Sequence, residues 1–130
     1  MMLLYISTPE NIQNLENIRK NNLRITGILK DNVKPQIKNS PSIIWLSYNV
    51  HGNEPSSSEA AMLTLYALVN PANTITKEWL KNTVVIIDPC LNPDGRDRYV
   101  NWFNQMVGSN EDADPQSREH SEPWPNGRSN

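Results

Sequence analysis

The sequence predicts an α/β protein in which helices sandwich a mainly parallel, mixed β-sheet as a three-layer structure. Two runs of four apolar residues, 43–46 and 84–87, are typical of strands covered on both faces of a parallel sheet. A segment with helical periodicity, at about 57–69, lies between them. Strand, helix and strand therefore predict a βαβ unit, whose crossover is almost always right-handed and whose strands are parallel.

Length and composition limit the possible functions. The chain has 130 residues, enough for one domain of ordinary size, and a net charge of −2 with both signs mixed. This pattern provides no basic patch for nucleic acid and no polybasic run for a membrane surface. Cys90 is the single cysteine, which excludes an intrachain disulfide. No apolar run approaches the ~18 residues of a spanning helix, and residues 1–6 are too short for a signal peptide core.

The first part of the chain predicts a short strand, a helix and a long connection. Residues 3–6 are apolar and indicate the strand. Thr8 is a candidate N-cap and Pro9 suits the first helical position. Apolar residues at three- and four-residue spacing then predict one helix to about residue 21. The polar, irregular residues 23–42 predict a connection over the surface.

The middle of the chain predicts the helical crossover. Ser56 is a candidate N-cap for the helix at 57–69, and Glu59, three residues later, completes a capping box. Residues 74–81 predict a shorter helix with Trp79 and Leu80 packed inward.

After the strand at 84–87, the segment 88–95 contains Asn-Pro and Asp-Gly, which are turn formers and predict a tight loop. The aromatic-rich residues 99–104 are expected to contribute to the core. Residues 108–130 contain few apolar side chains and predict a long polar loop.

His51 and Glu54 are the candidate metal ligands. They follow the first parallel strand, at the sheet edge where open α/β sheets bind their ligands, and the loop after residue 87 opens at the same edge. Imidazole and carboxylate are typical zinc ligands, at about 2.0–2.2 Å. Gly52 lets the backbone turn so that both side chains converge. The alternative is a surface histidine and a glutamate that only favours the helix N-terminus.

These motifs resemble those of the zinc carboxypeptidase family of carboxypeptidase A type. The His-Gly-Asn-Glu motif at 51–54 resembles the first zinc motif of the family, and Asn-Pro-Asp-Gly at 92–95 resembles its second signature. The resemblance is detailed over residues 43–100, and residues 118–125 resemble a bacterial branch of the family. Asn53 stands where some members carry an arginine that contacts extended substrates.

The resemblance implies zinc-dependent removal of the C-terminal residue from a peptide substrate. His51 and Glu54 would supply two of three protein ligands to Zn²⁺, and the third ligand would be a histidine beyond Asn130. Arg128 would polarise the scissile carbonyl, with Arg118 as the weaker alternative. His120 is the available substitute for the third ligand, although no predicted strand presents it.

The family's general base and its carboxylate-binding residues would also follow Asn130. We therefore expect residues 1–130 to be part of a catalytic domain that continues beyond both ends, with 108–130 as a loop at one end. By itself this part is expected to be inactive. Relatives are often secreted or periplasmic, but the chain shows no export signal. The preferred terminal residue and the oligomeric state do not follow from the sequence.

Two other functions remain open at this point. The same scaffold is compatible with a deacylase or amidase that acts on acylated amino acids. A non-catalytic module that binds peptides on the long loop is the other alternative. The Asn-Pro-Asp-Gly loop and the length of the loops favour the carboxypeptidase.

Overall fold

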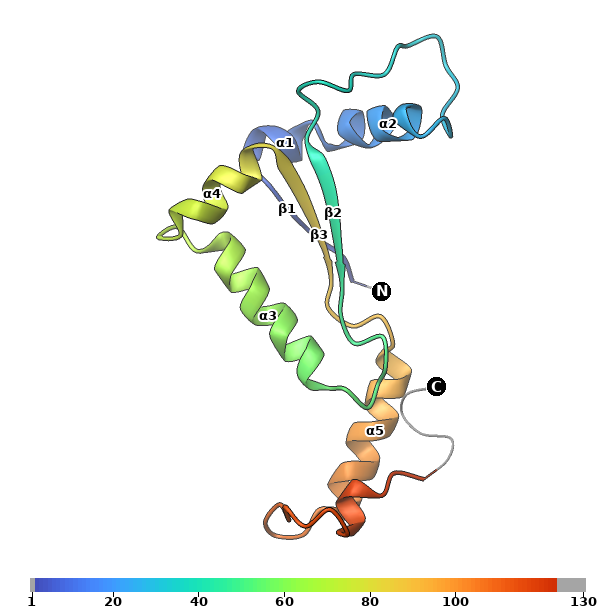
Figure 1. The fold of residues 1–130 in the computed structure, drawn as a ribbon, viewed down its shortest axis with the longest axis vertical. Helices are drawn as coiled ribbons and strands as arrows, with labels where there is room; N and C mark the ends of the chain where they lie inside the picture. Colours follow the sequence, from blue (N-terminus) through green and yellow to red (C-terminus); the bar gives the residue numbers. More distant parts are fainter. Residues whose placement is uncertain (1, 124–130) are drawn as a thin grey trace. The chain divides into compact units, whose positions relative to one another are not determined.

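The structure, a computed structural model, describes residues 2–123 and has the mixed α/β architecture that the sequence predicts (Figure 1). The elements are β1 (Leu4–Ile6), α1 (Pro9–Gln13), α2 (Leu15–Ile25), β2 (Ser42–Ser47), α3 (Ser56–Val69), α4 (Thr74–Lys81), β3 (Thr83–Asp88), α5 (Pro93–Met106) and the short 3-10 helix η1 (Arg118–His120).

The chain forms two compact units. We call Leu3–Leu46 with Thr64–Ile87 the sheet unit, and Ser47–Leu63 with the residues from Asp88 onward the loop unit.

The three strands form one sheet in the order β1-β3-β2. β1 is antiparallel to β3, with Leu4 opposite Ile87. The pairing of β2 with β3 begins with the Ser42 N–H, which donates to the Asn82 carbonyl at 2.9 Å, and the Tyr48 N–H donates to the Asp88 carbonyl at 2.9 Å. The sequence separation between the donor residue and the acceptor residue is the same in both hydrogen bonds. The two strands therefore run parallel, as Figure 1 shows and as predicted.

The two apolar strands differ in burial, which corrects one prediction. β3 lies in the middle of the sheet, and its Val84 and Ile87 are fully buried. β2 is an edge strand among the described residues, and it leaves 45% of Ile44 and 53% of Trp45 exposed. An apolar run predicts a strand correctly, but the position of the strand in the sheet decides what covers it.

The N-terminal helix is interrupted, whereas the sequence predicted one continuous helix. Thr8 caps α1 as predicted, because its Oγ1 accepts a hydrogen bond from the Asn11 N–H at 3.3 Å. Asn14, with φ −97° and ψ 12°, then separates α1 from α2. The Asn14 carbonyl accepts from the Ile18 N–H, so the helix resumes at once, and it continues to Ile25.

Polar side chains fix this helical segment to the end of α4 within the sheet unit. The Ser7 hydroxyl lies 2.7 Å from the Thr83 carbonyl and 3.1 Å from the Leu80 carbonyl. The Asn11 amide donates to the Leu80 and Lys81 carbonyls at 3.2 Å. The Leu80 and Lys81 carbonyls end α4 and would otherwise lack intrahelical partners, so the contacts satisfy them.

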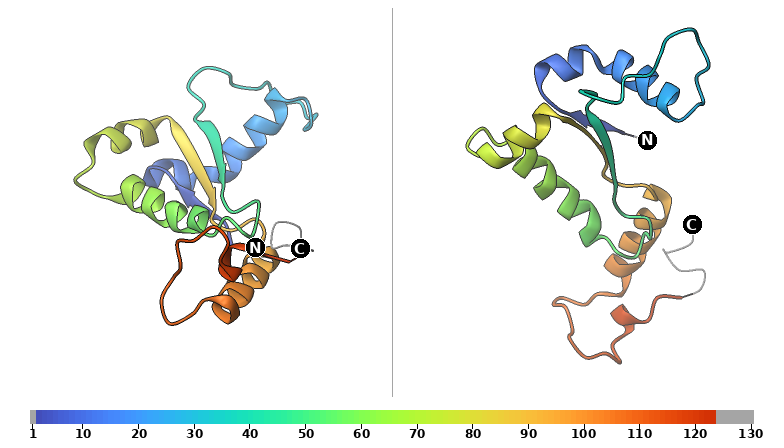
Figure 2. Two further views of the ribbon diagram at one scale, coloured as in Figure 1. Left: turned by 60° about the horizontal axis from the view of Figure 1, so that its bottom comes forward. Right: turned by 45° about the horizontal axis from the view of Figure 1, so that its top comes forward.

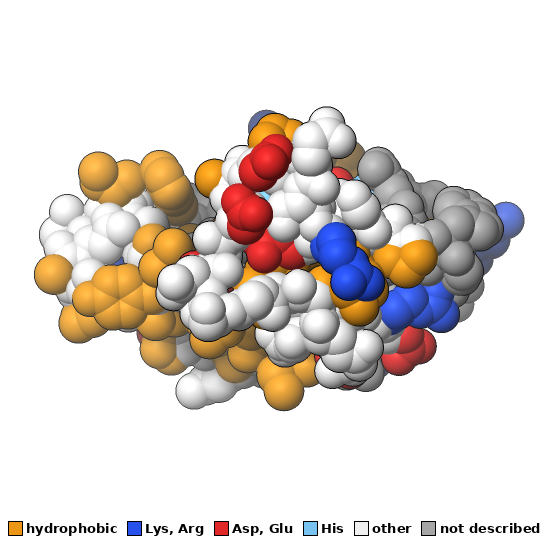
Figure 3. All heavy atoms as spheres, turned by 90° about the horizontal axis from the view of Figure 1, so that it is seen from below, with side chains coloured by type: hydrophobic (Ala, Val, Ile, Leu, Met, Phe, Trp, Pro, Cys, Tyr) orange, Lys and Arg blue, Asp and Glu red, His pale blue; other side chains and the backbone are white. Residues whose placement is uncertain are grey.

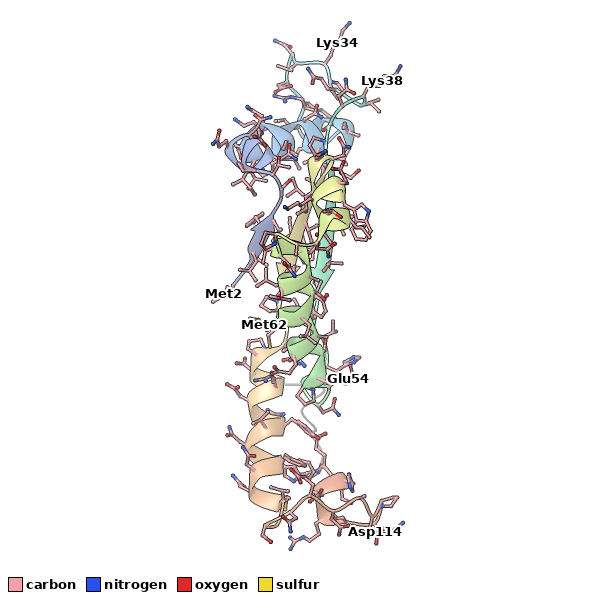
Figure 4. The ribbon with its side chains drawn as sticks, turned by 90° about the vertical axis from the view of Figure 1, so that its left-hand side faces the viewer. Met2, Lys34, Lys38, Glu54, Met62 and Asp114 are labelled. Carbon is pink, nitrogen blue, oxygen red and sulfur yellow. The ribbon has the colours of Figure 1, made fainter. Side chains whose placement is uncertain are left out.

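A long irregular connection joins α2 to β2, as predicted, and both views in Figure 2 show its course. Gly27, with φ 74°, lies just after α2 in the left-handed region that glycine adopts at little cost. Lys34 and Lys38 project from the outer part of this connection (Figure 4). The connection carries mostly exposed side chains, polar ones together with Ile28, Val33 and Ile37, and it lies in the sheet unit, so we assign it no part in the site.

The helices of the crossover match the predicted positions with two corrections. α3 begins at Ser56, which is therefore its first residue and not its N-cap, and the Glu59 carboxylate faces Arg96 at 3.4 Å. α4 has the predicted bounds and a buried Leu80, but Trp79 is 60% exposed instead of packed inward. In the face drawn in Figure 3, exposed hydrophobic side chains form an orange group at the left, the side on which Figure 1 has α3 and α4.

The Asn-Pro-Asp-Gly signature begins a helix and does not form a tight loop. Asn92 is the N-cap of α5, and its Oδ1 accepts from the Gly95 N–H at 3.0 Å. Pro93 occupies the first helical position, where the missing N–H is not needed. The aromatic residues that follow lie along this helix and are half-buried; the ring of Tyr99 is 5.7 Å from that of Trp102, centroid to centroid.

None of the helices that the structure describes is long and apolar enough to cross a lipid bilayer.

Candidate metal-binding site

His51 and Glu54 lie together on the loop between β2 and α3. His51 Nδ1 is 3.4 Å from Glu54 Oε2, as expected for side chains that converge across one turn. Both remain accessible, with 36% of the His51 side chain and 56% of the Glu54 side chain exposed. Figure 4 shows Glu54 where this loop enters α3. An ion from solvent can therefore reach both donors.

The separation of these two atoms fits a zinc ion. Two donors at about 2.0–2.1 Å from a tetrahedral ion are about 3.3 Å apart. The donor types, a ring nitrogen and a carboxylate oxygen, are also those that zinc prefers. However, no group of three or more His, Cys, Asp or Glu side chains that could hold a metal occurs within residues 2–123. The described part of the chain thus contains a pair of candidate ligands.

Backbone hydrogen bonds give this loop its shape. The Glu54 N–H donates to the His51 carbonyl at 3.1 Å, and the Ser57 N–H donates to the Glu54 carbonyl at 3.2 Å. The residue with a positive φ in this region is Asn49, at 52°. This corrects the assignment of the special backbone conformation to Gly52, which lies buried between the two candidate ligands.

A second loop, residues 89–92, lies beside the first, as the parallel strands predict. The Leu91 N–H donates to the Tyr48 carbonyl at 2.9 Å, and the Asn92 amide donates to the Val50 carbonyl at 3.3 Å. At the start of α3, the Ser58 hydroxyl donates to the Pro89 carbonyl at 2.9 Å. The two loops and the start of α3 therefore form one hydrogen-bonded structure in the loop unit.

Asn53 connects the candidate metal ligands to the C-terminal segment. Its Nδ2 donates to Glu122 Oε2 at 3.1 Å. Its Oδ1 is buried and has no hydrogen-bond partner among residues 2–123. A buried acceptor without a partner costs about 1–3 kcal/mol, so this oxygen lowers the stability of the loop by about that amount.

His120, the substitute third ligand, is engaged within its own segment. Its Nε2 lies 2.7 Å from the Asp112 carbonyl, and the neighbouring Glu119 is buried and accepts the Asp112 N–H at 2.9 Å. Asp114, labelled in Figure 4, lies farther out on the same loop. The described structure therefore does not bring His120 into a group with His51 and Glu54.

The third zinc ligand predicted from the family resemblance is not among the residues that the structure describes. It was expected beyond Asn130, and Asn130 itself lies outside the described residues. The pair formed by His51 and Glu54 is therefore the part of the predicted ligand set that the described structure contains. The identity and position of a third ligand stay a prediction.

The two candidate arginines are not placed at the site. Arg118 is the first residue of η1 and is exposed. Arg128 lies outside the described residues.

Sequence reasoning missed three buried polar residues of the loop unit, namely Asn49, Asp88 and Glu119. Asn49 carries the signal that could have found it, because asparagine is enriched at positive φ and this residue follows closely after a strand. Asp88 and Glu119 carry no such signal. The Asp88 carboxylate accepts the Cys90 N–H two residues along, and the Glu119 carboxylate accepts the Asp112 N–H, but what covers these side chains is decided by tertiary packing.

A mixed α/β sheet with a histidine–carboxylate pair beyond the carboxyl ends of its parallel strands is typical of α/β proteins that bind a ligand at that edge, and the two donor types suit a divalent metal. Within this class the family is shown by the sequence: residues 2–130 match the zinc carboxypeptidase family, and the chain belongs to it. No curated protein and no solved structure matches the chain. This match confirms the predicted family. Members of the family are in general zinc-dependent and act on peptide bonds.

Proposed function

We propose that His51 and Glu54 are zinc ligands of a carboxypeptidase that removes the C-terminal residue from peptides. The observation that carries this proposal is the 3.4 Å separation of His51 Nδ1 and Glu54 Oε2, on an accessible loop at the carboxyl edge of the parallel strands. The separation and the donor types match a tetrahedral zinc site.

The residues of this chain have distinct parts in the proposed site. When bound, zinc polarises the scissile carbonyl and lowers the pKa of a water molecule. Glu54 serves as a ligand and not as the general base, because its oxygen would be committed to the metal. Arg128 polarises the scissile carbonyl, with Arg118 as the alternative.

We also propose that residues 1–130 form part of a larger catalytic domain, with the third zinc ligand beyond Asn130. A catalytic zinc site uses three protein ligands and an open position. The pair formed by His51 and Glu54 then binds zinc weakly, and peptide hydrolysis needs the further ligand and a general base.

Zinc titration of the purified chain tests the ligand assignment. We expect weak binding by the wild-type chain, measured by calorimetry or by competition with a chromophoric chelator. Because each substitution removes a ligand, His51→Ala and Glu54→Gln should each bind zinc at least about tenfold more weakly. His120→Ala is the matched control and should bind zinc as the wild type does. Equal affinities for wild type and His51→Ala, or a loss in His120→Ala alone, would contradict the assignment.

A substrate comparison separates the peptidase from the two alternatives. In a protein that contains this chain and the remaining ligands, a blocked dipeptide with a free C-terminus should be cleaved, and chelation should abolish the cleavage. Preferential hydrolysis of an acylated amino acid would indicate the deacylase. Peptide binding without any hydrolysis would indicate the non-catalytic module.

A further inference from the structure

We propose that Asn49 is the positioning residue of the metal-binding loop, holding the main chains of His51 and Glu54 at the separation that their side chains need. This inference rests on the proposed function, since it concerns the same pair of ligands. Nothing in the motif itself assigns a role to Asn49, which precedes it by two residues.

The contacts of the Asn49 amide carry the inference. Its Nδ2 donates to the His51 carbonyl at 2.9 Å and to the Glu54 carbonyl at 3.1 Å. One NH₂ group thus uses both hydrogens on the main chains of the two candidate ligands. Asn49 is 1% exposed, so water does not replace these hydrogen bonds.

The other polar groups of Asn49 hold the residue itself in place. Its Oδ1 lies 3.1 Å from the Cys90 sulfur, whose S–H donates to it. Its main-chain N–H donates to Ser57 Oγ at 2.7 Å, and its carbonyl accepts the Asn92 N–H at 3.1 Å. Asn49 therefore connects the second loop and the starts of α3 and α5 to the His51–Glu54 turn.

Asparagine meets two requirements at this position. The backbone is left-handed, with φ 52°, a conformation in which asparagine is enriched and most other residues are strained. The side chain must also donate two hydrogen bonds to carbonyl oxygens. Glycine satisfies only the first requirement, and aspartate would direct a carboxylate oxygen at the two carbonyls.

The main test compares zinc affinity in Asn49→Gly with that in Asn39→Gly. Glycine keeps the positive φ at both positions and removes only the side chain. Asn39 is the matched control, because it has φ 64° and is exposed in the sheet unit. We expect Asn49→Gly to bind zinc about 10- to 100-fold more weakly, the range for residues that orient metal ligands. Asn39→Gly should bind as the wild type does.

A second readout does not depend on metal. In the metal-free chain, the Glu54 and Ser57 amides donate within the turn and should be protected from hydrogen exchange. In Asn49→Gly, their exchange should be at least about tenfold faster, whereas the amides of β3 should keep their wild-type rates. If Asn49 only supported overall stability, its substitution would raise the exchange rates of the turn amides and of the β3 amides together.

Cys90 variants keep the inference testable if Asn49→Gly does not fold. Cys90→Ser keeps a hydrogen donor for Asn49 Oδ1, and Cys90→Ala removes it. We expect weaker zinc binding and faster Glu54 exchange in Cys90→Ala than in Cys90→Ser.

The outcomes separate the two proposals. Wild-type zinc affinity and wild-type Glu54 exchange in Asn49→Gly, together with a loss of zinc binding in His51→Ala, would overturn the positioning role alone. Unchanged zinc binding in His51→Ala would overturn the ligand assignment. Faster exchange of Glu54 in Asn49→Gly would still support the role of Asn49 in shaping the turn.

Discussion

The sheet unit and the loop unit bury different kinds of side chain. In the sheet unit the buried residues are almost all apolar: Ile6, Ile18, Leu80, Val84, Val85 and Ile87, with Thr76 as the polar exception among those described. In the loop unit the buried side chains larger than alanine are polar or charged within the described residues: Asn49, Asp88 and Glu119.

This difference shows how each unit is specified. Apolar burial stabilises in proportion to the area removed from water and does not depend on direction. Buried polar groups contribute only where each donor and acceptor has a partner at the right distance and angle. We therefore expect substitutions in the sheet unit to change global stability, and substitutions in the loop unit to change local geometry.

The largest expected effect is in the sheet unit. Ile87 is fully buried on the central strand, so Ile87→Ala should lower the free energy of unfolding by about 2–5 kcal/mol. Ile44→Ala, at a half-exposed position on the edge strand, should lower it by less than about 1 kcal/mol. Urea unfolding of both variants measures the difference. Equal losses would show that the edge strand is as well covered as the central one.

An intermediate effect is expected in the loop unit. Glu119→Ala removes the carboxylate that accepts the Asp112 N–H at 2.9 Å, a hydrogen bond to a charged group worth about 1.5–3 kcal/mol. The loss should appear as faster hydrogen exchange at Asp112 and faster proteolysis of residues 108–121. Exchange in β3 should not change. Glu111→Gln, at an exposed neighbouring position, is the control and should behave as the wild type does.

The smallest effect concerns an exposed ion pair of the sheet unit. The hydrogen bond from Arg19 holds the pKa of Glu16 at about 2, below its ordinary value of 4.5. Because the folded-state pKa is lowered, the pair stabilises the fold above about pH 4.5, and this contribution is lost as the pH falls towards 2. Both side chains are exposed, so solvent screening keeps the contribution small.

A titration of Glu16 followed by NMR checks this prediction. The carboxyl group should titrate near pH 2 in the wild type and nearer its ordinary value in Arg19→Gln. Lys20 is a second cation near Glu16, at 3.6 Å, so Lys20→Gln is the matched variant and should shift the midpoint less. A wild-type midpoint close to pH 4.5 would be evidence against the pair.

Much of the fold follows from local patterns. Apolar runs predicted the strands, and the spacing of apolar residues predicted most of the helices, because both patterns report which face of an element is buried. Thr8 and Pro9 predicted the start of α1 from cap chemistry alone. The same chemistry at Asn92 and Pro93 indicated the start of α5, but Asp-Gly was interpreted as a turn instead.

The candidate site was predicted in part. His51 and Glu54 were identified by their type, spacing and position after a strand, and the structure brings them to 3.4 Å. Their role as ligands stays a prediction, as do the roles proposed for Arg128 and Arg118. His120 was considered only as a substitute ligand because no predicted strand presents it, and its contact with the Asp112 carbonyl, which depends on how the loop folds, was not predicted.

The sequence by itself determined the family of this chain, the positions along the chain of its strands and most of its helices, and the candidate ligand pair. Each of these depends on neighbours along the chain, which a local pattern records. Only the tertiary structure decided that β2 lies at an edge, that Trp79 is exposed, and that Asn49 shapes the ligand loop. The exposure of β2 and Trp79 depends on packing against groups distant in sequence. The hydrogen bonds of Asn49 join near neighbours, but they are directional and leave no periodic trace in the amino-acid order.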